Sequence, residues 1–421
     1  MSTLQPLQFY FMHFMPYPDV APGRPQGQWV DIPNRRFDPK IGHKLYKEYI
    51  DELVLADRLG YDGLVVNEHH ATFYSLMPSC SVIAGALAML TERAKICVFG
   101  TPIALTYPHR LAEEYAMLDV MSGGRLECAF PLGTGMEYWV NPINPSFSRE
   151  RFREGMDILM QAWTQPGPSR YDGEFYQYKY LNPFPLPYQK PHPKIYIVGS
   201  GTEETVNYAA EKGYGYSQVF TPIAGQLKSF ENYRATATNN GHKPDSESII
   251  ISAMAFVAET EEKAIEEGKD HILFYFKNLL TTDSHLNSPP GYLPVDRLRK
   301  RLESGAIQES EVTWESLTSV YRTVLGTPDL GCRTHRVLVR AGAEQQDHSA
   351  LACRRYAALE GGEKCHAVRR RSDSARQEAH IFCTPSRSRI ARIEKCLSLR
   401  SALSWSMEFA SKCSRRAVGN H

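Results

Sequence analysis

Histidines and a carboxylate stand together in one short segment, Asn67-Glu68-His69-His70, which directly follows the apolar run 63–66. Histidine exchanges protons near neutral pH, and beside a carboxylate it can also bind a metal ion. Adjacent residues of an extended chain point to opposite sides, so we expect only one of His69 and His70 to face a site. No third metal ligand follows at a useful spacing, so we expect no metal. Proton transfer, contact with a ligand and structural hydrogen bonding all remain open for this segment.

Two further loops follow apolar runs and contain glycine. Their candidate binding residues are Gly100 and Thr101 in the first loop, and Gly133, Thr134 and Tyr138 in the second. Glycine lets a backbone approach a flat ligand, and threonine can hydrogen-bond the edge of a ring. A plain strand-ending turn explains either loop equally well, so neither is decisive alone.

A fourth loop, Gly199-Ser200-Gly201-Thr202, leads from an apolar run into an expected helix. Backbone N–H groups at the start of a helix point outward and form a ready site for a phosphate. Thr202 or Ser200 could instead cap the helix without any ligand, and a glutamate that follows could complete a capping box. The two glycines around one serine favour phosphate binding.

These loops belong to a regular alternation of short apolar runs and helical stretches. The expected strands are 7–12, 63–66, 96–99, 126–130, 195–198, 217–220 and 249–257; the expected helices are 43–59, 79–90, 109–121, 149–163, 202–211, 223–239 and 261–279. Seven such units predict a parallel sheet with helical crossovers. Short, evenly sized apolar strands and the absence of a G-x-G-x-x-G motif after the first strand favour a closed barrel over an open sheet. We therefore expect an α/β fold of the (β/α)8 TIM type, whose active site lies at the carboxyl ends of the strands.

Two segments interrupt the alternation within residues 1–329. Tyrosines, phenylalanine and prolines in 169–193 predict an inserted hairpin and loop. The segment 281–302, which contains Pro289-Pro290-Gly291-Tyr292, is interpreted as a mobile lid, since lids exclude water from reactive sites.

The eighth strand–helix unit is not recognisable. Residues 313–325 are read as a helix and 326–329 as the start of another, after which the periodicity ends. The tail 330–421 is rich in arginine, serine and cysteine. One interpretation is a solvated basic extension. We favour a second hypothesis, a shift of the reading frame near Asp329, which translation of the other frames of the gene would test. An altered or missing eighth unit would leave strand edges unpaired and predict an insoluble or inactive product.

Charge and cysteine are distributed unevenly along the 421 residues. The net charge is +1, but residues 331–421 hold 18 Lys and Arg against 8 Asp and Glu, which leaves 30 against 39 in the first 330. The basic tail has few aromatic residues for stacking on bases, so we expect no nucleic-acid role. Three scattered cysteines before the tail (Cys80, Cys97 and Cys128) suit a reduced compartment. With no signal-peptide pattern and no apolar run of membrane-spanning length, a cytoplasmic protein without membrane contact is expected.

The loops, taken in order, resemble a known family. Asn67-Glu68-His69-His70 is similar to the E-H-H segment of bacterial luciferase-like flavin-dependent monooxygenases. The stretch 108–119, PHRLAEEYAMLD, and Ser122-Gly123-Gly124-Arg125 resemble that family's P-x-R-x-A-E-E…L-D…S-G-G-R signature. The turn 199–205 resembles its strand-five turn. The resemblance spans residues 5–329.

The resemblance implies a (β/α)8 enzyme that uses reduced FMN as a dissociable co-substrate, supplied by a flavin reductase, and O2 to oxygenate a small organic substrate. It places His69 or His70 near the reacting edge of the flavin. It places Gly100 and Thr101 beside the ring system. It places Asn67 at the cofactor, Gly133, Thr134 and Tyr138 by the ribityl chain and phosphate, and Gly199, Ser200, Gly201 and Thr202 around the phosphate. Glu113, Glu114, Asp119 and Arg125 are expected to hold the helix and turn together.

This chain departs from the family in one binding position, because Leu132 stands where many relatives carry an arginine. The double histidine favours FMN over a deazaflavin, since deazaflavin-dependent relatives usually lack it. The alternatives are a flavin- or deazaflavin-dependent reductase or dehydrogenase on the same fold, and an inactive flavin-binding barrel. Assembly as a homodimer is left open.

Overall fold

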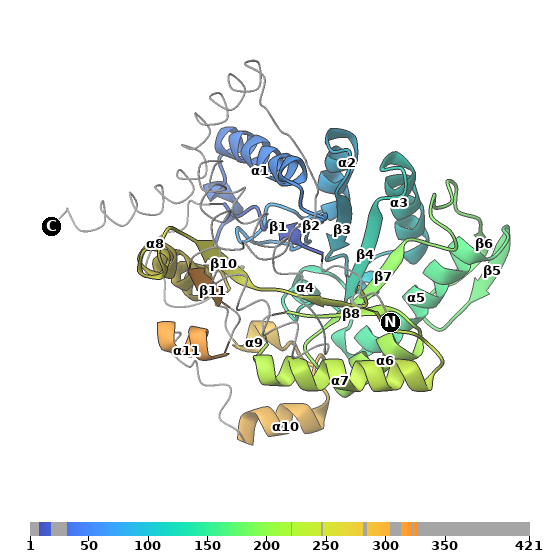
Figure 1. Cartoon of the computed structure of the whole chain (residues 1–421). Helices are drawn as coiled ribbons and strands as arrows, with labels where there is room; N and C mark the ends of the chain where they lie inside the picture. The colour runs from blue at the N-terminus through green and yellow to red at the C-terminus, as the bar shows by residue number, and fades with distance from the viewer. Residues whose placement is uncertain are drawn as a thin grey trace, which may run out of the picture.

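Seven parallel strands form one continuous curled sheet in the order β1-β2-β3-β4-β7-β8-β9 (Figure 1). The computed structural model describes residues 8–17, 32–219, 221–245, 247–280, 284–303, 313–320 and 323–326. The strands of the sheet are β1 Tyr10–Met12, β2 Gly63–Val66, β3 Lys95–Phe99, β4 Leu126–Pro131, β7 Lys194–Gly199, β8 Gly215–Gln218 and β9 Ile249–Ile251. Every neighbouring pair is parallel, as the alternation of strands and helices predicts.

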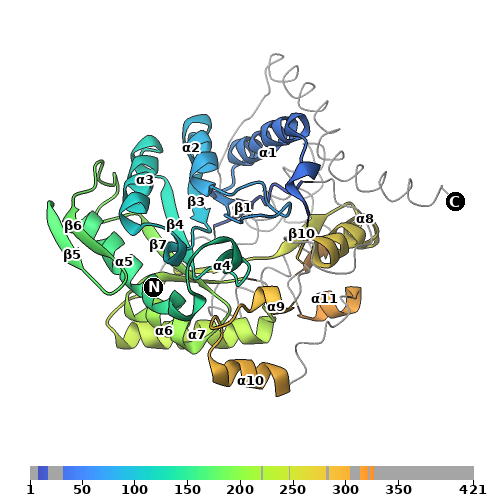
Figure 2. The same cartoon turned by 180° about the vertical axis from the view of Figure 1, so that it is seen from behind.

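The helices that connect the strands cover the outside of the sheet (Figures 1 and 2). They are α1 Pro39–Leu59, α2 Cys80–Leu90, α3 Pro108–Met121, α5 Ser148–Thr164, α6 Glu203–Glu211, α7 Ile223–Asn239 and α8 Glu261–Phe274. Local signals set their ends. The Asp38 side chain accepts a hydrogen bond from Lys40 N at the start of α1, and Gly60 ends that helix in the left-handed conformation, at φ +96°.

Alternate residues of the strands supply two separate hydrophobic clusters. Leu64 and Val66 face the helices and join the large outer core. Val65, between them, joins Cys97, Phe99, Ala129 and Tyr196 in a smaller cluster on the inner side of the curled sheet. This alternation is the one expected of a barrel, whose inner residues pack against each other while the outer ones pack under helices.

The last part of the barrel differs from the sequence-based prediction. The seventh strand, expected over 249–257, is broken into β9 and β10 Met254–Val257. The expected helix 313–325 is wrong at its end, because α11 Trp314–Val320 is followed by a strand, β11 Thr323–Gly326. β11 pairs in parallel with β10, and within the described residues the two strands form a separate two-stranded sheet. The prediction of a helix here was wrong because pairing with β10 outweighs the local helix propensity of a four-residue segment. The tail 330–421 and the proposed frame shift lie outside the described residues.

Two smaller differences concern element boundaries. The sixth strand was expected over 217–220, whereas β8 covers Gly215–Gln218. The helix expected to run to 279 ends as α8 at Phe274 and continues as one π-helical segment, Tyr275–Leu279. In the insertion, β5 Ser169–Asp172 and β6 Gln177–Leu181 form an antiparallel hairpin outside α5.

Short elements complete the described fold. They are the 3-10 turns Asn34–Arg36, Ile103–Leu105 and Pro145–Phe147, and the helices α4 Glu137–Val140, α9 Ser284–Asn287 and α10 Val295–Glu303. α4 lies in the loop after β4, and α9 lies beside it (Figure 2). The contact is direct, because the indole Nε1 of Trp139 donates to the Leu286 carbonyl at 3.2 Å. The segment expected to be a lid is thus packed on the strand-four loop.

Candidate active site

The Glu68 carboxylate is the centre of a small, partly buried network after β2. Its Oε2 lies 3.2 Å from the Cys80 thiol and 3.3 Å from the Thr101 hydroxyl, and its Oε1 lies 3.4 Å from His70 Nε2. Burial, followed by the nearby charge of Glu68, raises the pKa of Cys80 well above its usual range, so the thiol stays protonated and can donate. Glu68 lies within the predicted motif but was not among the predicted site residues.

The hydrogen bond to Glu68 raises the pKa of His70, and the charge of Glu68 adds to the effect against the opposing effect of burial. A raised pKa favours the charged imidazolium. The ion pair of His70 with Glu68 therefore persists to a higher pH than the charge of an unperturbed histidine would.

His69 makes a different contact, across the site to the strand-four loop. Its Nδ1 lies 3.0 Å from Oε1 of Glu137, whose side chain is 3% exposed. The second oxygen of Glu137 accepts the backbone N–H of Thr134 at 2.8 Å. Glu137 thus joins two segments that the sequence analysis selected separately. Glu137 was not predicted, because the candidate binding residues of this loop were chosen from its glycine, threonine and tyrosine.

Two buried polar atoms at this site have no hydrogen-bond partner within the described part of the protein. They are the amide Nδ2 of Asn67 and the hydroxyl Oγ1 of Thr134. The other amide atom of Asn67, Oδ1, accepts from the Ser75 hydroxyl at 3.0 Å. A buried polar group without a partner costs free energy, and a bound ligand is one way to supply the partner.

Close packing and backbone conformation explain why two positions in these loops are glycine. A Cβ on Gly100 would lie 2.4 Å from the backbone nitrogen of Glu68, so this glycine lets the loops after β2 and β3 pack together. Gly133 has φ +94°, and a Cβ there would lie 3.2 Å from Oε2 of Glu137. Both positions require glycine before any ligand is considered.

Tyrosines link the strand-four loop to the segment after α9. The hydroxyl of Tyr138 donates to the Leu132 carbonyl at 2.7 Å, and that of Tyr292 donates to the Gly133 carbonyl at 2.7 Å. The two rings are in contact, with centroids 5.4 Å apart. Arg149 also donates to the Tyr292 carbonyl, at 3.2 Å.

The turn after β7 adopts the capped form. The Thr202 hydroxyl accepts the Thr205 N–H at 3.3 Å and donates to the Thr205 hydroxyl at 2.8 Å. Gly201 has φ +87°, and its N–H donates to the Tyr216 hydroxyl at 3.1 Å. Ser200 is exposed and Gly199 is half-buried. The cap therefore forms without a ligand, and the outward N–H groups at the start of α6 lie beside it.

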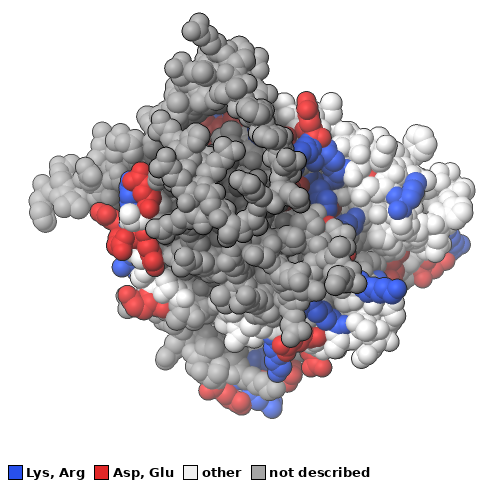
Figure 3. Space-filling view, viewed as in Figure 1, with Lys and Arg blue, Asp and Glu red and all other residues white. Residues whose placement is uncertain are grey.

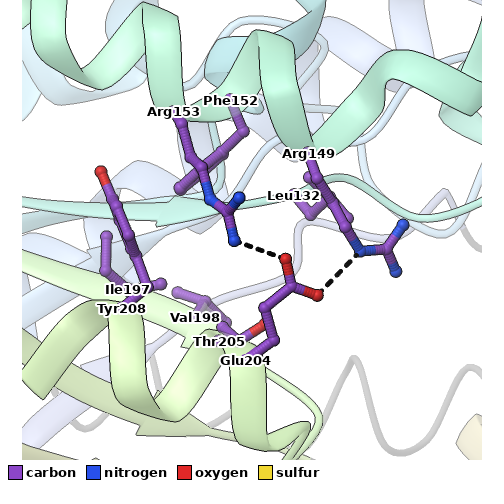
Figure 4. A pocket seen from close by; sticks show the side chains of 9 residues that line it. All are labelled: Leu132, Arg149, Phe152, Arg153, Ile197, Val198, Glu204, Thr205 and Tyr208. Atoms are coloured by element: carbon purple, nitrogen blue, oxygen red, sulfur yellow. Dashed lines mark hydrogen bonds and ion pairs between the residues drawn. The ribbon is translucent and has the colours of Figure 1, made fainter.

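A pocket lies against the start of α6, between that helix and α5 (Figure 4). Its lining is Leu132, Arg149, Phe152, Arg153, Ile197, Val198, Glu204, Thr205 and Tyr208. The carboxylate of Glu204 lies between Arg149 and Arg153 and pairs with both. The sequence analysis missed these arginines; their i, i+4 spacing at the start of a helix that follows the strand-four loop was the available signal.

The Glu204 carboxylate is the negative partner of both guanidinium groups in this pocket. The two guanidinium groups and the N–H groups at the start of α6 bring positive charge to the pocket, and Glu203 and Glu204 in the first turn of the helix oppose it. Leu132 lies in the same pocket, beside the two arginines from α5.

The described residues include no group of three or more His, Cys, Asp or Glu that could hold a metal ion. Among the same residues, no helix is both long and apolar enough to cross a membrane.

The chain matches a family model described as luciferase-like monooxygenase over residues 32–350, which starts and ends later than the span 5–329 that carried the resemblance. The oxygenase component of flavin-dependent trigonelline monooxygenase from Acinetobacter baylyi is 26% identical over 294 residues, covering 65% of this chain and 80% of that protein. The alkanal monooxygenase alpha chain of Photobacterium leiognathi is 24% identical, covering 57% and 68%. An uncharacterized protein, y4wF, of Sinorhizobium fredii is 32% identical, but the match spans only 60% of its length and 47% of this chain.

Solved structures share the fold at low sequence identity. The oxygenating constituent of 3,6-diketocamphane monooxygenase from Pseudomonas putida, in complex with FMN, aligns with a TM-score of 0.61 at 18% identity, covering 84% of this chain and 96% of that one. An F420-dependent secondary alcohol dehydrogenase aligns with a TM-score of 0.57 at 17% identity, covering 80% and 91%. These likenesses confirm the (β/α)8-type fold.

Proposed function

The chain belongs to the luciferase-like monooxygenase family, and we propose that it is an FMN-dependent monooxygenase that uses reduced FMN and O2 to oxygenate a small organic substrate. The observation that carries this proposal is the anion pocket at the start of α6. FMN differs from riboflavin by its phosphate, and the pocket presents two arginines and a helix N-terminus to such a group.

The residues present fit a flavin in two respects. Arg149, Arg153 and the N–H groups at the start of α6 would hold the phosphate. The orphaned Asn67 Nδ2 and Thr134 Oγ1 would supply polar contacts to its chain or ring. Reduced flavin, when bound, supplies the electrons that activate O2.

His69 and His70 would handle protons beside the ring. His70 carries a raised pKa from its bond to Glu68 and so can stabilise negative charge as an imidazolium. His69 is held by Glu137 and can exchange a proton through its imidazole. Tyr138, Tyr292 and the packed segment 284–292 would exclude water from this end of the site.

A separate flavin reductase is the proposed partner, because the Acinetobacter baylyi relative is named as an oxygenase component. A homodimer is also proposed. The neighbouring helices α2 and α3 expose apolar side chains, namely Val82, Met89, Leu90, Met117, Val120 and Met121. In Figure 3 the described surface on the right of the view is mostly white, with scattered Lys, Arg, Asp and Glu side chains. Light scattering of wild type and of Met89→Glu would test assembly: a mass of about 48 kDa for wild type would refute the dimer.

The test of the function is oxygen uptake by the purified protein with FMN, a flavin reductase, NADH and a panel of small organic substrates. A monooxygenase transfers one oxygen atom from 18O2 to the product. Hydride transfer to the substrate without oxygen demand would instead support a dehydrogenase, the reaction class of the F420-dependent neighbour. The absence of saturable flavin binding would support an inactive barrel.

A further inference from the structure

The buried carboxylate of Glu137 meets two nitrogens that belong to separate loops. Oε2 accepts the backbone N–H of Thr134 at 2.8 Å, and Oε1 lies 3.0 Å from His69 Nδ1. The backbone N–H can only donate, so Oε2 is committed as an acceptor. The Asn141 amide also donates to the Glu137 carbonyl at 2.9 Å, which fixes the backbone of the same residue.

The contact with His69 has a direct consequence for the imidazole ring. An ionised carboxylate has no hydrogen to donate, so the proton of the contact must belong to His69 Nδ1. A neutral imidazole carries a single N–H, and Nε2 is then the nitrogen with the lone pair. The ring is also held from the side by Tyr74, with centroids 5.0 Å apart.

We propose that Glu137 is a positioning residue for the proposed flavin-dependent reaction, which fixes His69 in the tautomer with hydrogen on Nδ1 so that Nε2 accepts the proton in turnover. The assignment deepens the proposed function and rests on it for the role in turnover. The tautomer itself rests only on the contacts of Glu137. His70 has a separate hydrogen-bond partner, Glu68, while the charge of Glu137 adds to the rise in the pKa of His70.

The substitution Glu137→Gln separates the hydrogen bond of the carboxylate to Thr134 from its contact with His69. A glutamine side chain has one oxygen and one NH2 group. Because the Thr134 N–H needs an acceptor, the amide oxygen stays at Thr134 and the NH2 group turns toward His69. His69 Nδ1 must then accept, and the hydrogen moves to Nε2. The loop keeps its hydrogen bond while the tautomer inverts.

The experiment is 15N NMR of the full-length, flavin-free protein labelled at histidine, with the His69 signals assigned by their loss in His69→Gln. We expect the Nδ1–H pattern in wild type and the Nε2–H pattern in Glu137→Gln. Glu154→Gln is the matched control: its carboxylate also accepts backbone N–H groups, from Phe175 and Tyr176, without touching His69. This control should keep the wild-type pattern.

An Nε2–H pattern in wild type would overturn the assignment, and this spectrum needs no variant to fold. An unchanged Nδ1–H pattern in a folded Glu137→Gln would overturn it as well. In turnover, Glu137→Gln should lower kcat by roughly 100-fold, the usual size of a general acid–base contribution, and leave the Kd for FMN unchanged. Loss of FMN affinity with unchanged kcat would refute the positioning role. Failure of the proposed function would show as absent turnover in wild type, which leaves the NMR result intact.

Discussion

Replacing Arg149 with methionine should weaken the binding of FMN and leave the binding of riboflavin unchanged. Arg149 lines the pocket at the start of α6 and pairs with Glu204 at 3.5 Å. Methionine keeps the length and the apolar stem of the side chain but removes the charge. Riboflavin lacks the phosphate, so it reports any loss of binding that has another cause.

The expected change in the Kd for FMN depends on how far each arginine side chain is exposed to solvent. A hydrogen bond to a charged group contributes about 1.5–3 kcal/mol, and the Arg149 side chain is only 24% exposed. Some screening by water remains, so we expect the lower part of that range, about 1.5–2 kcal/mol, or roughly a 10- to 30-fold increase in Kd for FMN. Arg153 is 48% exposed, and Arg153→Met should cost only about 0.5–1 kcal/mol, roughly 2- to 5-fold.

The assay is flavin titration by fluorescence and calorimetry at one fixed ionic strength, since charge contacts depend on salt. The matched control is Arg170→Met, an exposed arginine that pairs with Asp172 on the β5–β6 hairpin. It should change neither flavin. Equal weakening of FMN and riboflavin in Arg149→Met, or no change in either, would show that the pocket does not hold the phosphate.

Three further predictions concern charged side chains in three parts of the structure. Glu204→Gln should tighten FMN binding several-fold, about 1 kcal/mol, because the variant removes the negative charge that competes with the phosphate for the two arginines. A titration that shows weaker FMN binding would contradict this prediction. Arg125→Met should lower the free energy of unfolding by about 3–5 kcal/mol, because this guanidinium donates five hydrogen bonds, four of them to backbone carbonyls. Urea unfolding measures this loss, and Arg110→Met, at an exposed arginine, is the control. A loss of less than about 1 kcal/mol in Arg125→Met would contradict the prediction. The raised pKa of His70 means that its pair with Glu68 stabilises the fold fully below the ordinary histidine value of about 6.5, and that this contribution is lost as the pH rises through the folded value. Urea midpoints measured across that window should fall more with rising pH in wild type than in Glu68→Gln, and parallel curves would refute the pairing.

Arg125 illustrates a role that the sequence predicted well. The Ser122-Gly123-Gly124-Arg125 turn was expected to hold structure together, and Arg125 bonds the end of α2 and the loop before β3. Asp119 likewise accepts the backbone N–H of Gln189 at 2.8 Å and so anchors the insertion. The turn itself is recognisable from its serine and glycines, whereas the partners of Arg125 and Asp119 lie 31, 37 and 70 positions away and are set by the tertiary structure.

The end of the barrel was harder to predict. A strand of four residues, Thr323–Gly326, carries too little periodicity to be distinguished from the end of a helix. Its identity comes from the parallel partner β10, about seventy residues earlier in the chain. Long-range pairing of this kind leaves no local signature.

The sequence by itself determined the alternation of strands and helices, and with it the end of the barrel where the loops meet. It also determined which loops carry histidine, glycine and helix caps, because turns and caps depend on neighbouring residues. Only the tertiary structure decided which charges meet. Glu137 reaches His69 across 68 positions, and Glu204 reaches Arg153 across 51. The physical reason is that a carboxylate interacts with the partner that lies nearest in space, and the curling of the sheet sets that distance.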